Sequence, residues 1–220
     1  MRKHLLTVAI GVLALSGTAL AHEPGEVIFR VGAAHVAPDV DSSRVKVGGA
    51  QTNIKADVKS DTQLGLTASW IVVPHFGIEL LAATPFDHQV KLKPGGGSSV
   101  RLGKVKQLPP TLSAQYYFLS PQSRLQPYVG LGVNHTWFFK EKLASAQKAN
   151  YDDFELENSW GWAAQIGADI QIGNGMYVNA SVWKIDIDTK AKLRQANGTP
   201  VSVKAELDPW VYFLGLGFRF

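Results

Sequence analysis

Apolar and polar or small residues alternate along the last stretch of the chain, residues 210–220. One set of alternate positions is entirely apolar and has an aromatic residue at each end: Trp210, Tyr212, Leu214, Leu216, Phe218 and Phe220. Because successive side chains of a strand point to opposite faces, the pattern predicts a β-strand with one apolar face. An apolar face between two aromatic ends is typical of a strand that crosses a bilayer. A final strand that ends on Phe also resembles the signal read by the bacterial barrel-assembly machinery.

Seven further segments precede this one, so the sequence predicts eight strands: 26–37, 63–73, 76–87, 106–119, 125–140, 158–172, 176–189 and 201–220. Long polar connections (38–62, 88–105, 141–157 and 190–200) alternate with tight turns (74–75, 120–124 and 173–175). Bacterial outer-membrane barrels combine short periplasmic turns, long external loops and an even strand number. The prediction is therefore all-β: an eight-stranded antiparallel transmembrane up-and-down β-barrel with short periplasmic turns and long extracellular loops. A soluble sandwich is the alternative, but it has no reason to alternate its loop lengths.

The two faces of the predicted strands differ in side-chain size. Large apolar residues share one face of the second, fifth and sixth segments, which we expect to meet lipid: Leu64, Leu66, Trp70, Val72, Val129, Leu131, Val133, Trp137, Phe139, Trp160, Trp162, Ile166 and Ile170. The opposite faces carry mainly glycine, alanine and polar residues, which suit the narrow bore of an eight-stranded barrel. A soluble lipocalin-like barrel would place its large apolar residues inside instead.

The amino terminus has the three parts of a secretory signal peptide. A short basic region is followed by the apolar run 5–15, and Ala19-Leu20-Ala21 forms a cleavage site of small residues. We therefore predict a signal peptide at 1–21 and a mature barrel at 22–220. Loss of Arg2 and Lys3 reduces 22 basic residues to 20 against 18 acidic ones, so charge does not indicate nucleic-acid binding. The chain has no cysteine, which excludes thiol catalysis and disulfides.

Several blocks of the sequence carry a resemblance to a known family. They lie at 22–26, 62–67, 77–86, 108–112, 127–132, 181–189 and 207–210, and include Pro127-Tyr128-Val129-Gly130-Leu131-Gly132 and Leu207-Asp208-Pro209-Trp210. The chain resembles the outer membrane protein W family of Gram-negative bacteria, which includes alkane-import proteins. The resemblance implies a cell outer membrane location and an eight-stranded barrel that admits small hydrophobic molecules through an apolar channel. It also implies that Leu81 and Trp183 form a constriction in that channel.

Alternation along the strands also assigns residues to the barrel interior. Near the periplasmic ends it places four charged residues inside, Arg30, Glu79, Asp169 and Arg219. They are expected to pair, because unpaired charges away from water are costly. They form either an ionic floor that blocks an aqueous path or a set that only stabilises the lumen; neither interpretation fits an open porin. Higher up, the inward positions become apolar and are expected to line the channel: Leu81, Ala83, Phe138, Trp183 and Phe213.

Three prolines mark a further candidate site. Pro85 and the pair Pro109 and Pro110 lie on neighbouring strands at the outer edge of the expected apolar band. Since proline donates no ladder hydrogen bond, we predict that pairing fails there and opens a lateral window into the outer leaflet. Lateral release has been proposed for the resembled family. The alternative is that the prolines only end the regular ladder.

Other chemistry finds little support in the sequence. None of the six histidines pairs at a metal-ligand spacing, and none has the neighbouring nucleophile expected of a barrel hydrolase, so we predict no enzyme, metal or cofactor. Cations gather in the second long connection, where they face either lipopolysaccharide phosphates or only solvent: Lys91, Lys93, Arg101, Lys104 and Lys106. The expected partners are outer-membrane lipid, lipopolysaccharide, small hydrophobic ligands and the assembly machinery. A non-transporting barrel that acts as receptor or adhesin through its loops remains the alternative function.

Overall fold

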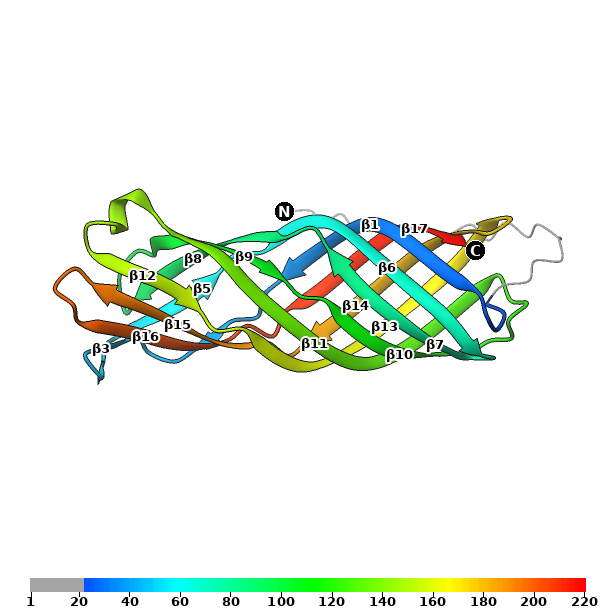
Figure 1. Ribbon diagram of the computed structural model, residues 1–220, viewed down its shortest axis with the longest axis horizontal. Helices are drawn as coiled ribbons and strands as arrows, with labels where there is room; N and C mark the ends of the chain where they lie inside the picture. Colours follow the sequence, from blue (N-terminus) through cyan, green and yellow to red (C-terminus); the bar gives the residue numbers. More distant parts are fainter. Residues whose placement is uncertain (1–21) are drawn as a thin grey trace, which may run out of the picture.

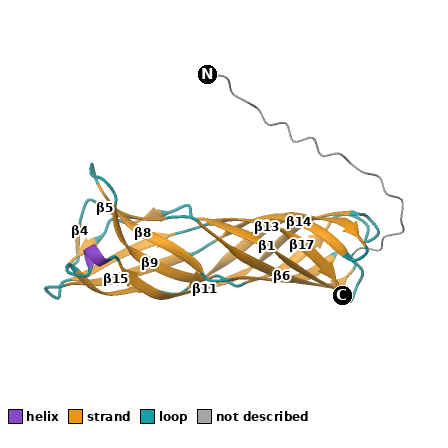
Figure 2. Cartoon of the chain, turned by 90° about the horizontal axis from the view of Figure 1, so that it is seen from above, coloured by secondary structure: helices purple, strands orange, loops and turns teal. Residues whose placement is uncertain are grey.

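The computed structural model describes residues 22–220, and the predicted signal peptide lies outside the described residues. These residues form a long, narrow all-β molecule (Figure 1). Its one short 3₁₀ turn, Ser145–Gln147, lies at the end remote from the C-terminus (Figure 2). Within the described part of the chain, no helix is long and apolar enough to cross a membrane.

Eight long antiparallel strands close into a barrel, as the sequence predicts. The neighbour order is β10-β7-β6-β1-β17-β14-β13-β11, and β11 pairs in turn with β10. The strands are β1 (Val27–Ala37), β6 (Asp61–Val73), β7 (Phe76–Ala83), β10 (Thr111–Tyr117), β11 (Leu125–Leu143), β13 (Ser159–Gly173), β14 (Met176–Ile185) and β17 (Trp210–Arg219). The C-terminus and the three tight turns lie at one end of the barrel, which is the periplasmic end of such proteins (Figure 1).

The long connections are also built mainly of strands, where the sequence analysis expected polar loops. They contain β2 (Asp41–Ser42), β3 (Lys46–Val47), β4 (Ala50–Gln51), β5 (Ile54–Val58), β12 (Tyr151–Leu156) and most of β8 (Phe86–Pro94), β9 (Val100–Leu108) and β15 (Asp188–Gln195). A further strand, β16 (Pro200–Glu206), lies in the predicted eighth segment, 201–220, which is interrupted before β17. We call these strands, together with the upper part of β11, the extracellular extension. Its strands β5, β8 and β9 continue the barrel sheet through β11, and a second sheet has the order β12-β15-β16-β3-β4 with β2 beside β16.

The extension holds together because its inward positions are apolar. Val90 and Val203 are buried, whereas the charged residues beside them in sequence point to solvent. The outward charges make these segments look polar on average, which explains why the sequence analysis did not recognise them as strands. Alternation itself is still present at period two.

The barrel turns its apolar side outward. On β17, Leu214 is 62 % exposed while its neighbour Phe213 is buried, and the same alternation runs along the other strands of the barrel. The predicted lipid-facing residues Leu131, Trp160 and Ile166 are likewise exposed. The strands approach each other closely: a Cβ added at Gly32 would lie 2.1 Å from the carbonyl oxygen of Leu214. Glycine is therefore required at this close backbone contact.

This orientation predicts the effect of a charge on the outer surface. Leu214→Arg, near the middle of β17, should lower the free energy of unfolding by about 2–4 kcal/mol, because the charge must enter hydrocarbon. Val100→Arg, in the extension, is the matched control and should change it by less than about 0.5 kcal/mol. Urea-dependent unfolding in lipid vesicles measures both. Equal effects would mean that the apolar face of β17 does not contact lipid.

Candidate functional site

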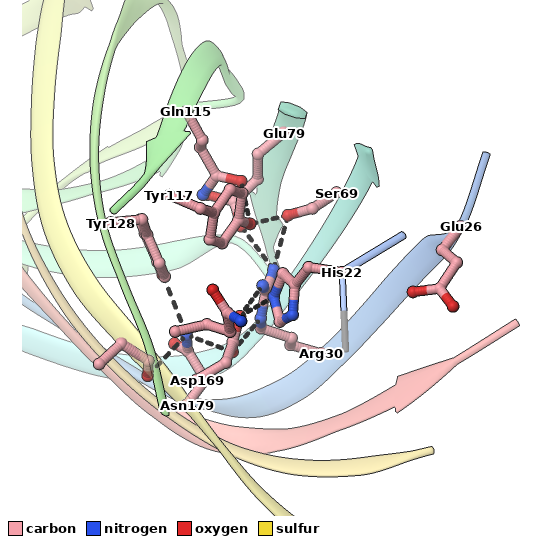
Figure 3. Close-up of polar contacts among 12 residues, drawn as sticks. His22, Glu26, Arg30, Ser69, Glu79, Gln115, Tyr117, Tyr128, Asp169 and Asn179 are labelled. Atoms are coloured by element: carbon pink, nitrogen blue, oxygen red, sulfur yellow. Dashed lines mark hydrogen bonds and ion pairs between the residues drawn. The ribbon is translucent and has the colours of Figure 1, made fainter. Parts of the chain in front are cut away.

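A buried network of charges closes the periplasmic half of the lumen (Figure 3). Arg30 of β1 lies at its centre: its Nε donates to Asp169 Oδ1 at 2.8 Å and its Nη1 to Glu79 Oε2 at 2.8 Å. A third bond runs from Nη1 to Ser69 Oγ at 2.6 Å. The side chains of Arg30, Glu79 and Asp169 are all buried. One cation thus joins two carboxylates from opposite sides of the barrel.

Neutral side chains donate further hydrogen bonds to both carboxylates. Asp169 accepts from Asn179 Nδ2 at 2.9 Å, and Glu79 Oε1 accepts from Gln165 Nε2 at 3.1 Å. Ser69 Oγ donates to Glu79 Oε2 at 2.9 Å. A buried ion pair is tolerated only when such additional hydrogen bonds compensate its lost hydration. The network therefore meets the condition for charges held inside a narrow barrel.

His22 completes the floor from below. Its Nε2 lies 3.0 Å from Asp169 Oδ2, and its ring packs against Tyr117 and Tyr177 at centroid distances of 4.6 and 5.5 Å. These two tyrosines belong to a small apolar cluster at the periplasmic end, with Tyr128, Ile28 and Ile71. The sequence analysis did not identify His22 as a lumen residue, because it precedes the first strand and has no periodic pattern around it.

Arg219, the fourth charged residue expected in this set, lies elsewhere. Its side chain is 25 % exposed and its Nη1 lies 3.2 Å from Glu26 Oε1. Figure 3 shows Glu26 apart from the cluster around Arg30. Arg219 faces Ile28 in the ladder, two residues closer to the barrel end than Arg30, and this places its guanidinium at the rim. Three of the four predicted residues are therefore brought together.

An apolar layer lies directly above the charged network. Leu81, Trp183 and Phe213 are buried there in one continuous cluster, with Phe138 above them and the half-buried Ala83 packed against it. The Phe213 ring occupies space left by Gly65, where an added Cβ would be 3.0 Å from the ring. The indole Nε1 of Trp183 donates to Ser181 Oγ at 3.3 Å. The five residues predicted to line the channel thus belong to one apolar region.

The same apolar cluster continues upward into the extension. Its upper members come from both sheets and include Val90, Leu102, Leu193, Val201 and Val203. They enclose a cavity of about 50 Å³ whose lining is almost entirely apolar. A continuous apolar cluster thus runs from the extension down to Trp183, with a few buried polar side chains such as His88 and Gln107 beside it, and the lumen becomes charged below.

The ladder is interrupted between the third and fourth barrel strands, where the three prolines lie. Pairing of β7 with β10 ends at Leu81 opposite Thr111, and pairing of β8 with β9 begins at Phe86 opposite Gln107. Between these two pairs the third strand runs five positions, from 81 to 86, and the fourth strand runs four, from 107 to 111. The third strand therefore carries one extra residue. Pro85 lies on one side of this gap, and Pro109 and Pro110 lie on the other.

The gap is bounded on both sides by strands that are hydrogen-bonded to their outer neighbours. Asn134 Nδ2 of β11 donates to the carbonyl oxygens of Pro109 and Pro110, at 3.1 Å each, and the backbone N–H of His135 donates to Pro110 at 3.1 Å. On the other side, Thr84 N–H donates to the carbonyl of Leu64 in β6 at 2.9 Å. The unpaired edges are thus 82–85 and 108–110, facing each other across the break.

Cations cover the outer surface of β5, β8 and β9 above the break. Lys55 lies opposite Lys93, and Lys91 lies opposite Arg101. Repulsion from Lys59 is the main cause that lowers the pKa of Lys91. Lys93 and Lys104 contact carboxylates: Asp57 at 2.8 Å and Asp87 at 3.3 Å, respectively. Lys106 lies opposite Asp87 on the same sheet.

Carboxylates gather at one other point of the described chain. Asp186, Asp188 and Asp208 place one oxygen each within 4.8 Å of the others, next to the top of β14. A divalent cation prefers oxygen ligands of this kind, but an acidic cluster alone does not define a metal site. The absence of a metal site therefore stays a prediction.

The closed barrel, its apolar outer surface and its lumen, which is charged below and largely apolar above, define a class of protein. This class is the eight-stranded outer-membrane β-barrel. The chain belongs to the OmpW family, which its sequence matches over residues 23–220. It is 40 % identical to outer membrane protein W of Salmonella typhi over 222 residues, with both chains fully covered. It is also 30 % identical to outer membrane protein AlkL of Ectopseudomonas oleovorans over 177 residues, which cover 79 % of this chain and 72 % of AlkL.

A solved structure supports the same assignment. The crystal structure of the outer membrane protein OprG from Pseudomonas aeruginosa superposes with a TM-score of 0.88 at 44 % identity, covering 92 % of this chain and 99 % of that one. The predicted family, fold and outer-membrane location are therefore confirmed. The family consists of outer-membrane barrels and not of enzymes, in agreement with the sequence analysis.

The charged network predicts a large stability difference between two arginines. Arg30→Met leaves Asp169 and Glu79 without their cation and should lower the free energy of unfolding by about 3–5 kcal/mol. Arg219→Met removes a partly exposed pair at the rim, where water can replace the lost partner, and should cost only about 1 kcal/mol. Unfolding in urea, with the protein in lipid vesicles, compares the two. Similar losses for both variants would contradict the central position of Arg30.

Proposed function

We propose that the protein is an outer-membrane channel for the passive uptake of small hydrophobic molecules. A molecule enters through the extracellular extension, moves down the apolar interior as far as Leu81 and Trp183, and leaves sideways through the ladder break into the outer leaflet. The observation that carries the proposal is the continuous apolar cluster that joins the extension to the level of the break. The resemblance to a family with alkane-import members supports the same substrate class.

The charged floor supports a lateral rather than a downward exit. An apolar molecule that continued downward would have to separate Arg30 from Asp169 and Glu79, whose bonds are 2.8 Å long. Breaking a buried pair of this kind costs several kcal/mol, and an apolar ligand offers no compensating hydrogen bond. Sideways movement meets no such network, and each CH₂ group that reaches the acyl chains gains about 0.8 kcal/mol over water.

The gap between 82–85 and 108–110 is the proposed lateral window. Prolines at 85, 109 and 110 supply no N–H, so the two edges cannot form a complete ladder there. Pro109 is buried at this gap, so passage requires these edges to part. Residues 109 and 110 are held to β11 through Asn134, and residues 82–84 are held to β6 through the ladder and Thr84, so opening the gap requires one edge to move together with its neighbouring strand.

The interior bears on the alternative role as receptor or adhesin in two ways: its continuous apolar lining supports transport, and its close packing supports the alternative. A barrel that serves only as a scaffold for surface loops needs a packed lumen but no apolar route to the membrane. The cavity of about 50 Å³ is narrow, so a ligand must widen it on entry. Pockets that hold small ligands usually measure about 300–1,000 Å³.

Lipopolysaccharide is the proposed lipid partner of the extension. Like charges that face each other across a ladder destabilise it, as at Lys55 opposite Lys93 and Lys91 opposite Arg101. An anionic headgroup removes this repulsion, and phosphates lie at this height in the outer leaflet. The cations stand above the break, so bound headgroups would border the proposed window.

Two neighbouring leucines test the route through the lumen. Leu81→Asn places an amide in the apolar layer and should slow uptake of an apolar tracer about tenfold, because the tracer gains less from that layer. Leu80→Asn, one residue away on the lipid-facing side, is the matched control and should leave uptake nearly unchanged. Uptake is measured in liposomes with a lipopolysaccharide outer leaflet. Equal rates for both variants and the natural protein would overturn the channel and favour the receptor role.

The prolines test the window separately. Replacing both, Pro109→Ala and Pro110→Ala, restores two N–H donors. That of residue 109 faces the carbonyls of 82–85, whereas residue 110 already faces β11 through its carbonyl. Uptake should then fall several-fold, since opening the edge would break the new bond. Pro121→Ala, in a periplasmic turn, provides the control. Uptake that remains unchanged in the double variant would mean that the molecules leave by another path.

A further inference from the structure

His88 is one of the buried polar side chains just above the ladder break, where Gln107 lies opposite Phe86. His88 of β8 is 1 % exposed, and it alternates with Phe86 and Val90, which are buried as well. All three therefore point inward from the same strand face. The imidazole stacks on the Phe86 ring at 5.9 Å and 21°, and Val105 lies opposite it on β9.

Its hydrogen bonding fixes the state of the ring. Nδ1 of His88 lies 2.7 Å from the carbonyl oxygen of Lys59. A carbonyl oxygen only accepts, so Nδ1 carries the proton. Burial lowers the pKa of His88 and outweighs the bond to Lys59 and the carboxylates of Asp61 and Asp87, which favour the protonated ring. The neutral ring is therefore favoured.

Nε2 is then an unprotonated acceptor. It is buried and has no hydrogen-bond partner among the described residues. A buried acceptor left unpaired costs free energy, and a ligand that donates a hydrogen bond to it would recover that cost. A hydrocarbon of the same shape would not.

The position of His88 places this acceptor on the proposed route. Val90, two residues above it, lines the cavity of the extension. Pro85, three residues below it, lies in the ladder break. At about 3.3 Å per residue, the imidazole lies roughly 7 Å from one level and 10 Å from the other.

We propose that Nε2 of His88 selects, among small apolar molecules, those that carry a single hydrogen-bond donor such as the hydroxyl of an alcohol or a phenol. This inference rests on the proposed uptake function and names its preferred ligand class. The hydroxyl donates to Nε2 while the rest of the molecule stays against Phe86, Val90 and Val105. Molecules without a donor still pass, but leave the acceptor unpaired.

A pair of matched ligands tests the selection. 2-Naphthol carries one hydroxyl donor, and 2-methoxynaphthalene has the same skeleton without a donor. Equilibrium binding to the purified full-length protein in detergent, and uptake into liposomes with a lipopolysaccharide outer leaflet, are measured for both. The ratio of the two affinities cancels their shared hydrophobic contribution.

His88→Phe removes the acceptor but keeps an aromatic ring against Phe86. It should reduce the preference for 2-naphthol about 3- to 10-fold, the strength of one hydrogen bond. His88→Gln retains a side-chain acceptor and should keep part of the preference. His35→Phe, on the outer surface, is the control and should change nothing. Heat-dependent gel mobility shows whether each variant is folded.

The possible outcomes separate this inference from the proposed function. If both compounds enter and the ratio is the same in the natural protein and in His88→Phe, the role of His88 is overturned while uptake stands. If neither compound binds, or if neither enters liposomes with protein faster than liposomes without it, the uptake function and the role of His88 are both overturned. The assignment is supported if the preference for 2-naphthol is lost in His88→Phe, partly retained in His88→Gln and unchanged in His35→Phe. If His88→Phe does not fold, His88→Gln is compared with the natural protein instead. The role of His88 is overturned if the ratio of the two affinities is the same in both proteins at pH 7 and also at low pH, where Nε2 becomes protonated.

Discussion

The absence of water inside a bilayer is the constraint on which the rest of this structure depends. Lipid offers no partner for backbone N–H and C=O groups, so strands can cross it only if their ladder closes on itself. Here β11 meets β10 and completes the circle with eight strands. Eight strands leave a narrow bore, in which each charged group must find its partner within the barrel. Arg30, Asp169 and Glu79 meet this condition together.

The same constraint limits where the ladder can be broken. A gap between strands in the middle of the hydrocarbon would expose backbone groups to lipid, whereas proline removes the N–H that would be left unpaired. The break lies above the buried network, beside the apolar layer formed by Trp183 and Phe213, and below the cations of β8 and β9. The lumen lining changes from charged to apolar at about the height where the third and fourth strands stop pairing. A lateral route for an apolar molecule is consistent with both changes.

Much of this arrangement could be predicted from alternation along the sequence. The eight strands, their lipid-facing side and the inward positions of Arg30, Glu79 and Asp169 all follow from a period of two. Other features leave no periodic signal. His22 precedes the first strand, and Arg219 differs from Arg30 only in its distance from the barrel end. The strands of the extension were hidden by their outward charges, and the role of Asn134 depends on contacts between strands far apart in sequence.

The extra residue on the third strand has a consequence for how the two halves of the molecule are joined. Below the break, odd-numbered positions such as Leu81 face inward, and above it the inward positions are even-numbered, such as Phe86 and His88. On this strand the inward positions are therefore odd-numbered in the barrel and even-numbered in the extension, and the change takes place within residues 82–85. If the strand alternated without interruption from Leu81, Phe86 and His88 would point outward and the lysines of the upper strand would turn inward. An extension exchanged between related barrels must therefore preserve this offset as well as the sequence of its strands.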